Sequence, residues 1–262
     1  MIGIDYQPVS TTPAFDGFVP DSLQRDILKM LMDSSYTYRY ESLDHLAAEL
    51  KIRASTVTAA RDLAHGGIKF KVFRDSVANT DYWRRTPEGG FELRGDVLPS
   101  DAIQDIFLHG SKYGTECATA MIIVLYKAML DVMPTDTFNR LYSDIYLMNW
   151  KHVDRDLAMT MRDEAADLLP GDARYFMNPD VDPVTPEWQG ENVYYLGGGR
   201  YYGHGIGIET GDGIIRALNS NRRPDATRKA YLDDSVKRQD YLYLSRFLQS
   251  PAMAGAASAA GQ

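Results

Sequence analysis

The chain has 262 residues, 44% of them apolar, and its 28 basic and 36 acidic side chains give a formal net charge of −8. This is the composition of a globular protein long enough to bury a core, and the acidity argues against a nucleic-acid-binding protein, which usually carries a basic surface. The single cysteine, Cys117, excludes an intramolecular disulfide and any zinc site that needs two thiolates.

The N-terminal segment 1–20 contains three prolines and no hydrophobic periodicity, which predicts an irregular arm. It has neither a basic start nor a long apolar run, so we expect no secretory signal peptide and a cytoplasmic protein. The longest apolar stretch, 118–126, is too short to cross a membrane, and we expect no membrane association.

Helical spacing of apolar residues dominates the first half of the chain. A serine or aspartate stands before each of the first three predicted helices as a candidate N-cap, and Gly66-Gly67 ends the third. Later, 115–133 is apolar on nearly every side, which is typical of a helix buried in a core. The predicted helices are 21–32, 42–50, 55–63, 101–108, 115–133 and 137–146.

Strand-like segments lie around the turn 87–90 and again after Pro170. Phe70 to Phe73 is one such segment, and the turn separates Tyr82-Trp83 from 91–93, as in a hairpin. The later predicted strands, separated by glycine-rich turns, are 173–176, 192–196, 200–202, 205–208 and 213–215. Helices followed by strands indicate an α+β fold. We expect one domain over 1–250 and a disordered tail over 251–262, which is rich in alanine, serine and glycine.

Cys117 is predicted to open the buried helix, with Gly114 supplying a turn and Thr115 an N-cap. The positive end of the helix dipole would lower the pKa of the thiol and populate the nucleophilic thiolate near neutral pH. The alternative is an inert core cysteine, which is the commoner fate of a lone buried cysteine.

A cysteine nucleophile needs a base and an orienting group. His204 lies between glycines at the start of a predicted strand, and general chemistry makes it the candidate base. Glu191 begins another predicted strand, and Glu116 directly precedes the cysteine. Each of the three alone is weak evidence, because turn histidines and surface carboxylates are common.

The combined pattern is more specific than its parts. A cysteine on a buried helix, followed by Gly171-Asp and then by Gly-His-Gly before a strand, is similar to papain-like cysteine enzymes and to their NlpC-type branch. A closer resemblance is to the spore-coat transglutaminases of bacilli, over about residues 23–225. Its principal motifs are Glu116-Cys-Ala-Thr-Ala, Gly171-Asp-x-x-Tyr-Phe-x-Asn-Pro, Trp188-x-Gly-Glu-Asn-Val and His204-Gly-x-Gly-Ile. The first 20 residues and the tail carry no such match.

This resemblance implies a papain-like core in which a buried catalytic helix packs on an antiparallel sheet. It implies that Cys117 is the nucleophile, that Glu191 is its main partner, and that Glu116 is a partly redundant second partner. His204 would then orient Glu191 rather than act as the base. Family members enclose the site in an aromatic tunnel, and the matching positions here are Phe70, Tyr175 and Trp188, with Trp150 nearby. For aromatic residues, ordinary core packing is the commoner role.

The reaction that the resemblance implies is acyl transfer from a protein glutamine to a lysine amine, which forms an Nε-(γ-glutamyl)lysine crosslink. No cofactor, metal or calcium is implied, and the sequence contains no calcium-binding loop motif. The expected partners are protein substrates, with no nucleic acid, for a monomer that is cytoplasmic or placed in the spore coat of a sporulating host. Two alternatives stay open: a cysteine hydrolase or glutamine deamidase, and a non-catalytic coat or interaction protein.

Overall fold

The computed structural model describes residues 1–4, 7–9, 21–164 and 167–248. An antiparallel sheet with the order β13-β12-β11-β10-β15-β9 lies at the centre of the fold, and β14 pairs with β10 outside this path. The bounds of its strands are β9 (Met159–Arg162), β10 (Ala173–Met177), β11 (Gly190–Gly197), β12 (Arg200–Gly203), β13 (Gly207–Thr210), β14 (Tyr231–Leu232) and β15 (Val236–Gln239).

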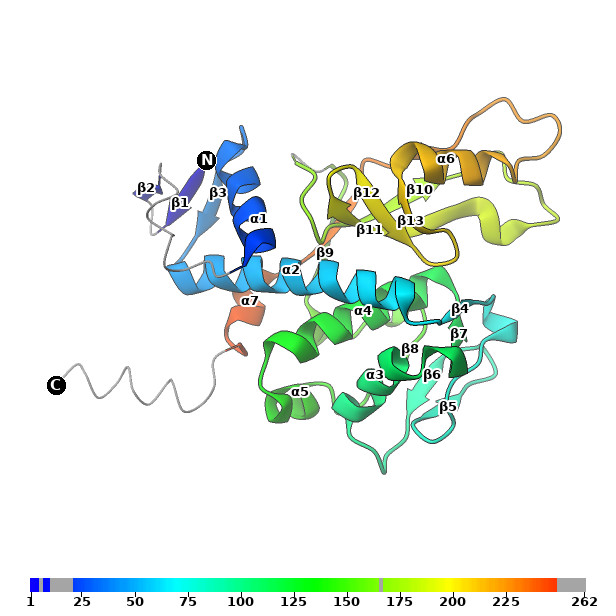
Figure 1. Ribbon diagram of the computed structural model, residues 1–262, viewed down its shortest axis with the longest axis horizontal. Helices are drawn as coiled ribbons and strands as arrows, with labels where there is room; N and C mark the ends of the chain where they lie inside the picture. The colour runs from blue at the N-terminus through cyan, green and yellow to red at the C-terminus, as the bar shows by residue number, and fades with distance from the viewer. Residues whose placement is uncertain (5–6, 10–20, 165–166, 249–262) are drawn as a thin grey trace.

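Helices cover both faces of this sheet, as Figure 1 shows. Alternate residues of β11 point to opposite faces. Tyr194 therefore joins the main core with α4 (Cys117–Val132), while Val193 packs with α6 (Gly211–Asn219). The expected α+β fold, with a buried helix against an antiparallel sheet, is confirmed.

The long helix α2 (Leu43–His65) packs along α4 and crosses the middle of the molecule (Figure 1). Ile52 and Val57 of α2 are fully buried in the same core as Ile122 and Ile123 of α4. Full burial of an aliphatic side chain of this size stabilises a fold by about 2 kcal/mol. The remaining helices are α1 (Ser22–Asp33), α3 (Pro99–Leu108), α5 (Thr135–Leu141) and α7 (Tyr241–Ser245), with 3-10 turns η2 (Phe73–Asp75), η3 (Gly110–Lys112), η4 (Trp150–His152), η5 (Arg155–Leu157) and η6 (Pro186–Gln189).

The N-terminal segment is not wholly irregular, so that prediction is wrong for its first residues. Strands β1 (Ile2–Ile4) and β2 (Gln7–Val9) pair with each other, and β1 also pairs in parallel with β3 (Tyr38–Tyr40). Ile2 is fully buried and packs in a second core with α1 and the first turns of α2, which explains the order of this segment. The rest of the predicted arm, 5–6 and 10–20, and the predicted disordered tail lie outside the described residues.

Small sheets complete the architecture below the long helices in Figure 1. The predicted hairpin is confirmed: β5 (Trp83–Arg85) pairs with β6 (Phe91–Leu93) across the turn. Strand β8 (Tyr146–Leu147) joins β6, so the predicted helix 137–146 is wrong at its end, because α5 stops at Leu141. Strand β4 (Lys69–Phe70) pairs in parallel with β7 (Gly114–Thr115), and Phe73 begins a 3-10 turn instead of ending a strand.

Two further predictions are wrong for identifiable reasons. The helices expected over 42–50 and 55–63 are one helix, because Ser55 donates its hydroxyl to the Ala128 carbonyl of α4, 3.1 Å away, instead of capping a new helix. The strand expected over 213–215 is part of α6. Thr210 caps this helix through Gly213 N at 3.1 Å, and Ile214 lies one turn from Leu218 in the core.

A buried ion network ties α2 to the central sheet. Arg53 donates Nε to Glu49 at 2.7 Å and Nη1 to Asp172 at 2.8 Å, and Arg238 of β15 donates to both oxygens of Asp172 at 2.7 Å. The two arginines hold the pKa of the Asp172 carboxyl below its usual range, although burial opposes this effect. Removing one partner from such a network would leave an uncompensated buried charge.

Within the described residues, no helix is long and apolar enough to cross a membrane.

The N-terminal core and the main core share α2, which contributes Leu46 and Leu50 to the first and Ile52 and Val57 to the second. A single domain over 1–250 stays a prediction, and this shared helix supports it.

Candidate active site

Cys117 is the first residue of α4, as predicted, and is only 3% exposed. The N-cap is Glu116 rather than the predicted Thr115, since the Glu116 carboxylate accepts a hydrogen bond from Ala118 N at 2.8 Å. Thr115 instead lies in β7, where its parallel pairing with Phe70 of β4 fixes the backbone just before the helix. The cysteine is therefore held at the junction of a strand pair and the core helix.

Two polar side chains contact the thiol directly. Cys117 Sγ lies 2.9 Å from Glu116 Oε1, to which it donates, and it accepts a hydrogen bond from Asn192 Nδ2 at 3.3 Å. Asn192 is fixed in turn by Trp150, whose indole nitrogen donates to Asn192 Oδ1 at 2.9 Å. Asn192 was not among the predicted site residues, although it lies inside the Trp188-x-Gly-Glu-Asn-Val motif.

The structure does not support the lowered pKa expected of the thiol. Burial raises the pKa of Cys117 well above its usual value, and the nearby carboxylates of Glu191 and Glu116 raise it further. Both effects disfavour the thiolate. The resting site therefore holds a thiol whose proton has a carboxylate beside it.

Glu191 is the second residue of β11 and is 5% exposed. Burial and the charge of Glu116 raise the pKa of its carboxyl well above the usual range. Its Oε1 atom has no hydrogen-bond partner among the described residues. Gly203 makes room for it, because a Cβ at that position would lie 2.8 Å from this oxygen. An under-bonded, buried carboxyl with a raised pKa is suited to proton transfer.

His204 lies at the tight turn after β12, not at the start of a strand, and it makes no hydrogen bond to Glu191. Its Nε2 donates to the Lys69 carbonyl at 3.2 Å, and its Nδ1 accepts from the Tyr202 hydroxyl at 3.1 Å. Burial lowers the pKa of His204 to about 4, so the ring is neutral at pH 7. The structure therefore shows no hydrogen bond between His204 and Glu191, although both line one cavity, and an orienting role for His204 stays a prediction.

Replacing His204 by glutamine is expected to reduce kcat/KM by no more than about tenfold, since an amide can replace one donor and one acceptor. Loss of a general base typically costs about 10² to 10⁴ in rate. Because the pKa of about 4 lies below the range, the variant and the wild type should show the same pH–rate profile between pH 5.5 and 8. A larger loss, with a titration near pH 6 to 7 removed, would return the base role to His204.

The predicted tunnel aromatics fall into two groups. Phe70 and Trp188 line a cavity of about 60 Å³ together with Glu191 and His204. Such a volume holds roughly two water molecules, so the carboxyl faces a small space. Tyr175 lies by the thiol: burial, with the charges of Cys117 and the two glutamates, raises its pKa to about 12. A continuous tunnel that includes Trp150 stays a prediction.

A lysine near the site had no signal in the sequence. Lys237 of β15 places its Nζ 5.2 Å from the centre of the Trp150 ring, and burial lowers the pKa of its amine. A cation over an indole face is attracted to the ring. Since Trp150 holds Asn192 and Asn192 holds the thiol, Lys237 supports one wall of the site. Among the described residues, this site included, no group of three or more histidine, cysteine or acidic side chains is arranged to hold a metal ion.

The family model described as protein-glutamine gamma-glutamyltransferase matches residues 1–248 of this chain. The chain belongs to this family. The match begins at residue 1, so the expectation that the first 20 residues lack the resemblance is wrong. The family is that of transglutaminases, which are acyltransferases acting on protein substrates.

Individual relatives agree with this assignment. The chain is 42% identical over 239 residues to a protein-glutamine gamma-glutamyltransferase of Bacillus cereus strain B4264, covering 91% of this chain and 85% of the relative. It is 44% identical over 234 residues to one of Bacillus anthracis strain CDC 684, covering 89% and 83%. The solved structure of a transglutaminase from Geobacillus stearothermophilus, without its C-terminal extension, is 49% identical, with a TM-score of 0.76 over 79% of this chain and 98% of that one.

Proposed function

We propose that the γ-glutamyltransferase activity of this chain proceeds through a thioester on Cys117, with Glu191 and Glu116 as its proton-transfer partners. The observation that carries the proposal is the 2.9 Å contact between the buried thiol and a carboxylate oxygen. A nucleophile hydrogen-bonded to a base is the arrangement that covalent acyl transfer needs.

In the first half-reaction, Cys117 Sγ attacks the carbonyl carbon of a glutamine γ-carboxamide. A carboxylate takes the thiol proton as the carbon–sulfur bond forms, and returns it to the departing nitrogen, which leaves as ammonia. The product is a γ-glutamyl thioester. Concerted proton transfer removes the need for a free thiolate, which the raised pKa of Cys117 makes rare.

In the second half-reaction, a lysine amine attacks the thioester carbonyl. The carboxylate accepts the amine proton and passes it to the leaving sulfur, so the thiol re-forms and an Nε-(γ-glutamyl)lysine bond results. Water would compete as the acceptor and give only deamidation. The cavity lined by Phe70, Trp188 and Glu191 has room for only a few water molecules, which supports limited competition from water in this step.

The division of labour between the two glutamates is part of the proposal. The Glu116 carboxylate accepts hydrogen bonds from the thiol and from Ala118 N, so it is well placed to receive the thiol proton. Glu191 lies in the cavity, and its raised pKa brings it closer to the pKa needed for a base acting near neutral pH. We assign Glu191 the main role and Glu116 a partly redundant one.

The test is incorporation of a fluorescent primary amine into a glutamine-rich carrier protein, with ammonia release followed in parallel. A γ-glutamyltransferase should label the carrier covalently and release one ammonia for each amine incorporated or glutamine hydrolysed. Release of ammonia with no label at saturating amine would favour the alternative of a cysteine hydrolase or glutamine deamidase. Neither signal would favour a non-catalytic protein.

Activity is expected to persist in an excess of EDTA or EGTA, because the proposed steps use only a thiol and carboxyl groups. The measurement is the initial rate of amine incorporation before and after chelation, with a calcium-dependent transglutaminase as the positive control. Loss of activity that calcium restores would contradict the proposal.

The proposed setting follows from the relatives and the composition. The relatives come from Bacillus species, which supports a role in the spore coat of a sporulating host, after synthesis in the cytoplasm. The net charge of −8 supports a protein that does not use nucleic acid as a partner. We further propose that the protein acts as a monomer and does not associate with a membrane.

A further inference from the structure

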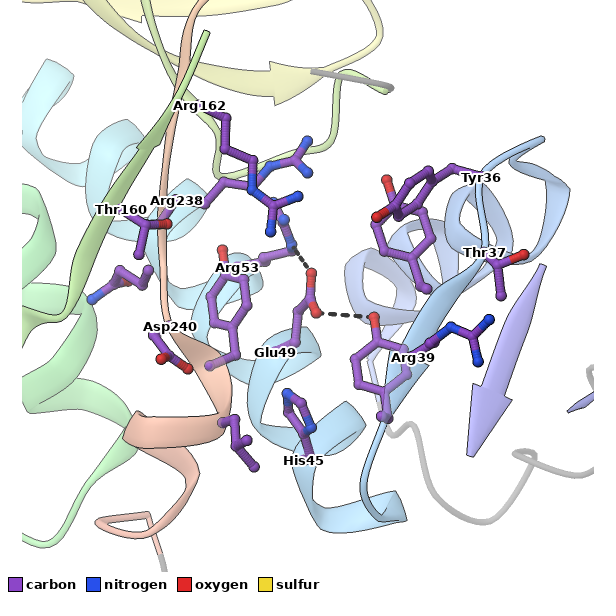
Figure 2. Close-up of a pocket in the computed structure, with 15 residues that line it drawn as sticks. Tyr36, Thr37, Arg39, His45, Glu49, Arg53, Thr160, Arg162, Arg238 and Asp240 are labelled. Atoms are coloured by element: carbon purple, nitrogen blue, oxygen red, sulfur yellow. Dashed lines mark hydrogen bonds and ion pairs between the residues drawn. The ribbon is translucent and has the colours of Figure 1, made fainter. Parts of the chain in front are cut away.

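A cleft of about 400 Å³ lies between β3, the first half of α2, and the strands β9 and β15 (Figure 2). It shares no lining residue with the cavity at Glu191. The volume lies within the range that small-molecule sites occupy. Four arginines line it, against two carboxylates, in a chain whose net charge is −8: Arg39, Arg53, Arg162 and Arg238, against Glu49 and Asp240.

Two of these arginines are fixed in place and still have donors to spare. Arg53 uses Nε and Nη1 on Glu49, Asp172 and the Pro170 carbonyl, and Arg238 uses Nε and Nη2 on Asp172 and the Asp167 carbonyl. No hydrogen bond within the described residues uses Arg53 Nη2 or Arg238 Nη1. Because Asp172 anchors both side chains, these free donors are pre-oriented.

Arg162 adds a charge that has no partner among the described residues. It lies on β9 two residues beyond Thr160, which is opposite Arg238, so the side chains of Arg162 and Arg238 are on the same face of the sheet. Figure 2 shows the Arg162 side chain reaching toward Arg238 at one end of the cleft, while Asp240 and His45 lie at the other end.

Other donors and charges around the cleft agree with this polarity. Tyr241 lines the cleft beside Arg53, and its hydroxyl makes no hydrogen bond within the described part of the chain. Each carboxylate oxygen of Glu49 already accepts a hydrogen bond from the protein, one from Arg53 and one from Tyr40, whose hydroxyl donates at 2.9 Å. Burial lowers the pKa of His45, so it is neutral at pH 7 and does not add charge at the far end.

An arginine-rich surface elsewhere in the chain provides a contrast. In the open hollow beside β5 and β6, Arg84 pairs with Glu92, Arg94 pairs with Asp96, and Arg85 donates to backbone carbonyls. Each guanidinium there has an acceptor from the protein. In the cleft at β9 and β15, by contrast, Arg162 has no acceptor among the described residues, and Arg53 and Arg238 each leave one terminal nitrogen without a hydrogen bond there.

We propose that the arginine end of this cleft is a binding site for a small oxyanion-bearing ligand, a phosphate or a polycarboxylate. Arg162 and the free edges of Arg53 and Arg238 would donate charge-assisted hydrogen bonds to its oxygens, for which the planar guanidinium is well suited. Such a ligand would join β9 and β15 to the helix α2, so its binding should stabilise the folded chain.

The test is thermal unfolding of the full chain with inorganic phosphate or with citrate, at an ionic strength held constant with sodium chloride. A specific site should raise Tm along a saturable curve with at least one of the two anions, by about 5 °C at concentrations well above Kd. Comparing the two anions separates a phosphate site from a polycarboxylate site.

The variant Arg162→Gln should weaken binding at least tenfold, and Arg162→Lys should be intermediate, since it retains the charge but not the planar fork. The matched control is Arg61→Gln on the exposed face of α2, which should bind as the wild type does. Amine incorporation should be unchanged in Arg162→Gln, so this result is independent of the proposed catalytic roles. An equal shift in wild type and Arg162→Gln would mean an adventitious ion only, and no saturable shift with either anion would overturn the proposal.

Discussion

Replacement of Cys117 by alanine is expected to abolish amine incorporation, to below about one part in a thousand of the wild-type rate. The reason is that no other thiol exists in the chain, and a thioester cannot form without Sγ. The fold should survive, because the substitution removes only the sulfur atom. It also removes no charge, since the raised pKa keeps the thiol neutral. The measurement is the initial rate of amine incorporation, with Tm recorded for each protein.

The matched control is Cys117→Ser, which keeps a hydroxyl donor for Glu116 and differs from the wild type mainly in nucleophilicity. Mass spectrometry of wild-type enzyme mixed with a glutamine peptide should detect the peptide acyl group on Cys117, with loss of ammonia. Activity of a few per cent or more in Cys117→Ala, at unchanged Tm, would show that another group is the nucleophile.

Simultaneous replacement of Glu191 and Glu116 by glutamine is expected to lower the rate of amine incorporation by about 10³-fold or more. The reason is that these two are the carboxylates whose charges act on the Cys117 thiol. Each single variant should keep a measurable rate, and Glu191→Gln should lose more. Groups that act as alternatives give such non-additive losses, whereas groups that act in series do not.

The pH profile adds a second readout for the glutamates. A base works only when deprotonated, so activity should rise with pH through the pKa of Glu191, which burial raises above the ordinary value of 4.5. This acidic limb should move or vanish in Glu191→Gln and remain in the exposed control Glu88→Gln. A wild-type rate in the double variant would remove both carboxylates from the mechanism.

The position of Glu116 bears on the ranking of the two glutamates. With Thr115 as the predicted N-cap, Glu116 would lie on the helix, where the side chain of a neighbour points about 100° away from Cys117. Glu116 instead precedes the helix as its N-cap, with extended backbone, and its side chain folds back to the thiol. Helix geometry therefore does not separate the two carboxylates, and the larger effect expected of Glu191 now depends on its burial and raised pKa.

Much of the fold was predictable, because its main elements have strong local signals. The apolar helix at Cys117, the hairpin around 87–90 and the strands after Pro170 all follow from periodicity and turn residues. The misjudged elements have two different causes. Ser55 has the residue type of an N-cap, but a distant contact decides its role, because its hydroxyl donates to the Ala128 carbonyl. The helix that contains Gly213 was missed although its cap is local, because Thr210 accepts a hydrogen bond from Gly213 N three residues later.

The sequence predicted which residues form the site better than it predicted the hydrogen bonds that they make. The motif resemblance named Cys117, Glu116, Glu191 and His204, and the structure brings them to one region. Sequence could not reveal that both ring nitrogens of His204 are engaged by Tyr202 and Lys69, because these partners come from separate strands. Desolvation, which sets the pKa of the thiol, is likewise a property of the packed molecule.

Asp172 shows that a family motif can mark architecture instead of chemistry. The Gly-Asp motif that helped the sequence resemblance supplies the buried carboxylate shared by Arg53 and Arg238. A single replacement that removes one of these charges leaves a buried charge without its partner, which lowers the free energy of unfolding by about 3 to 5 kcal/mol. The three residues can therefore change only together, so descendants of this sequence are expected to retain all of them long after their surface residues have diverged.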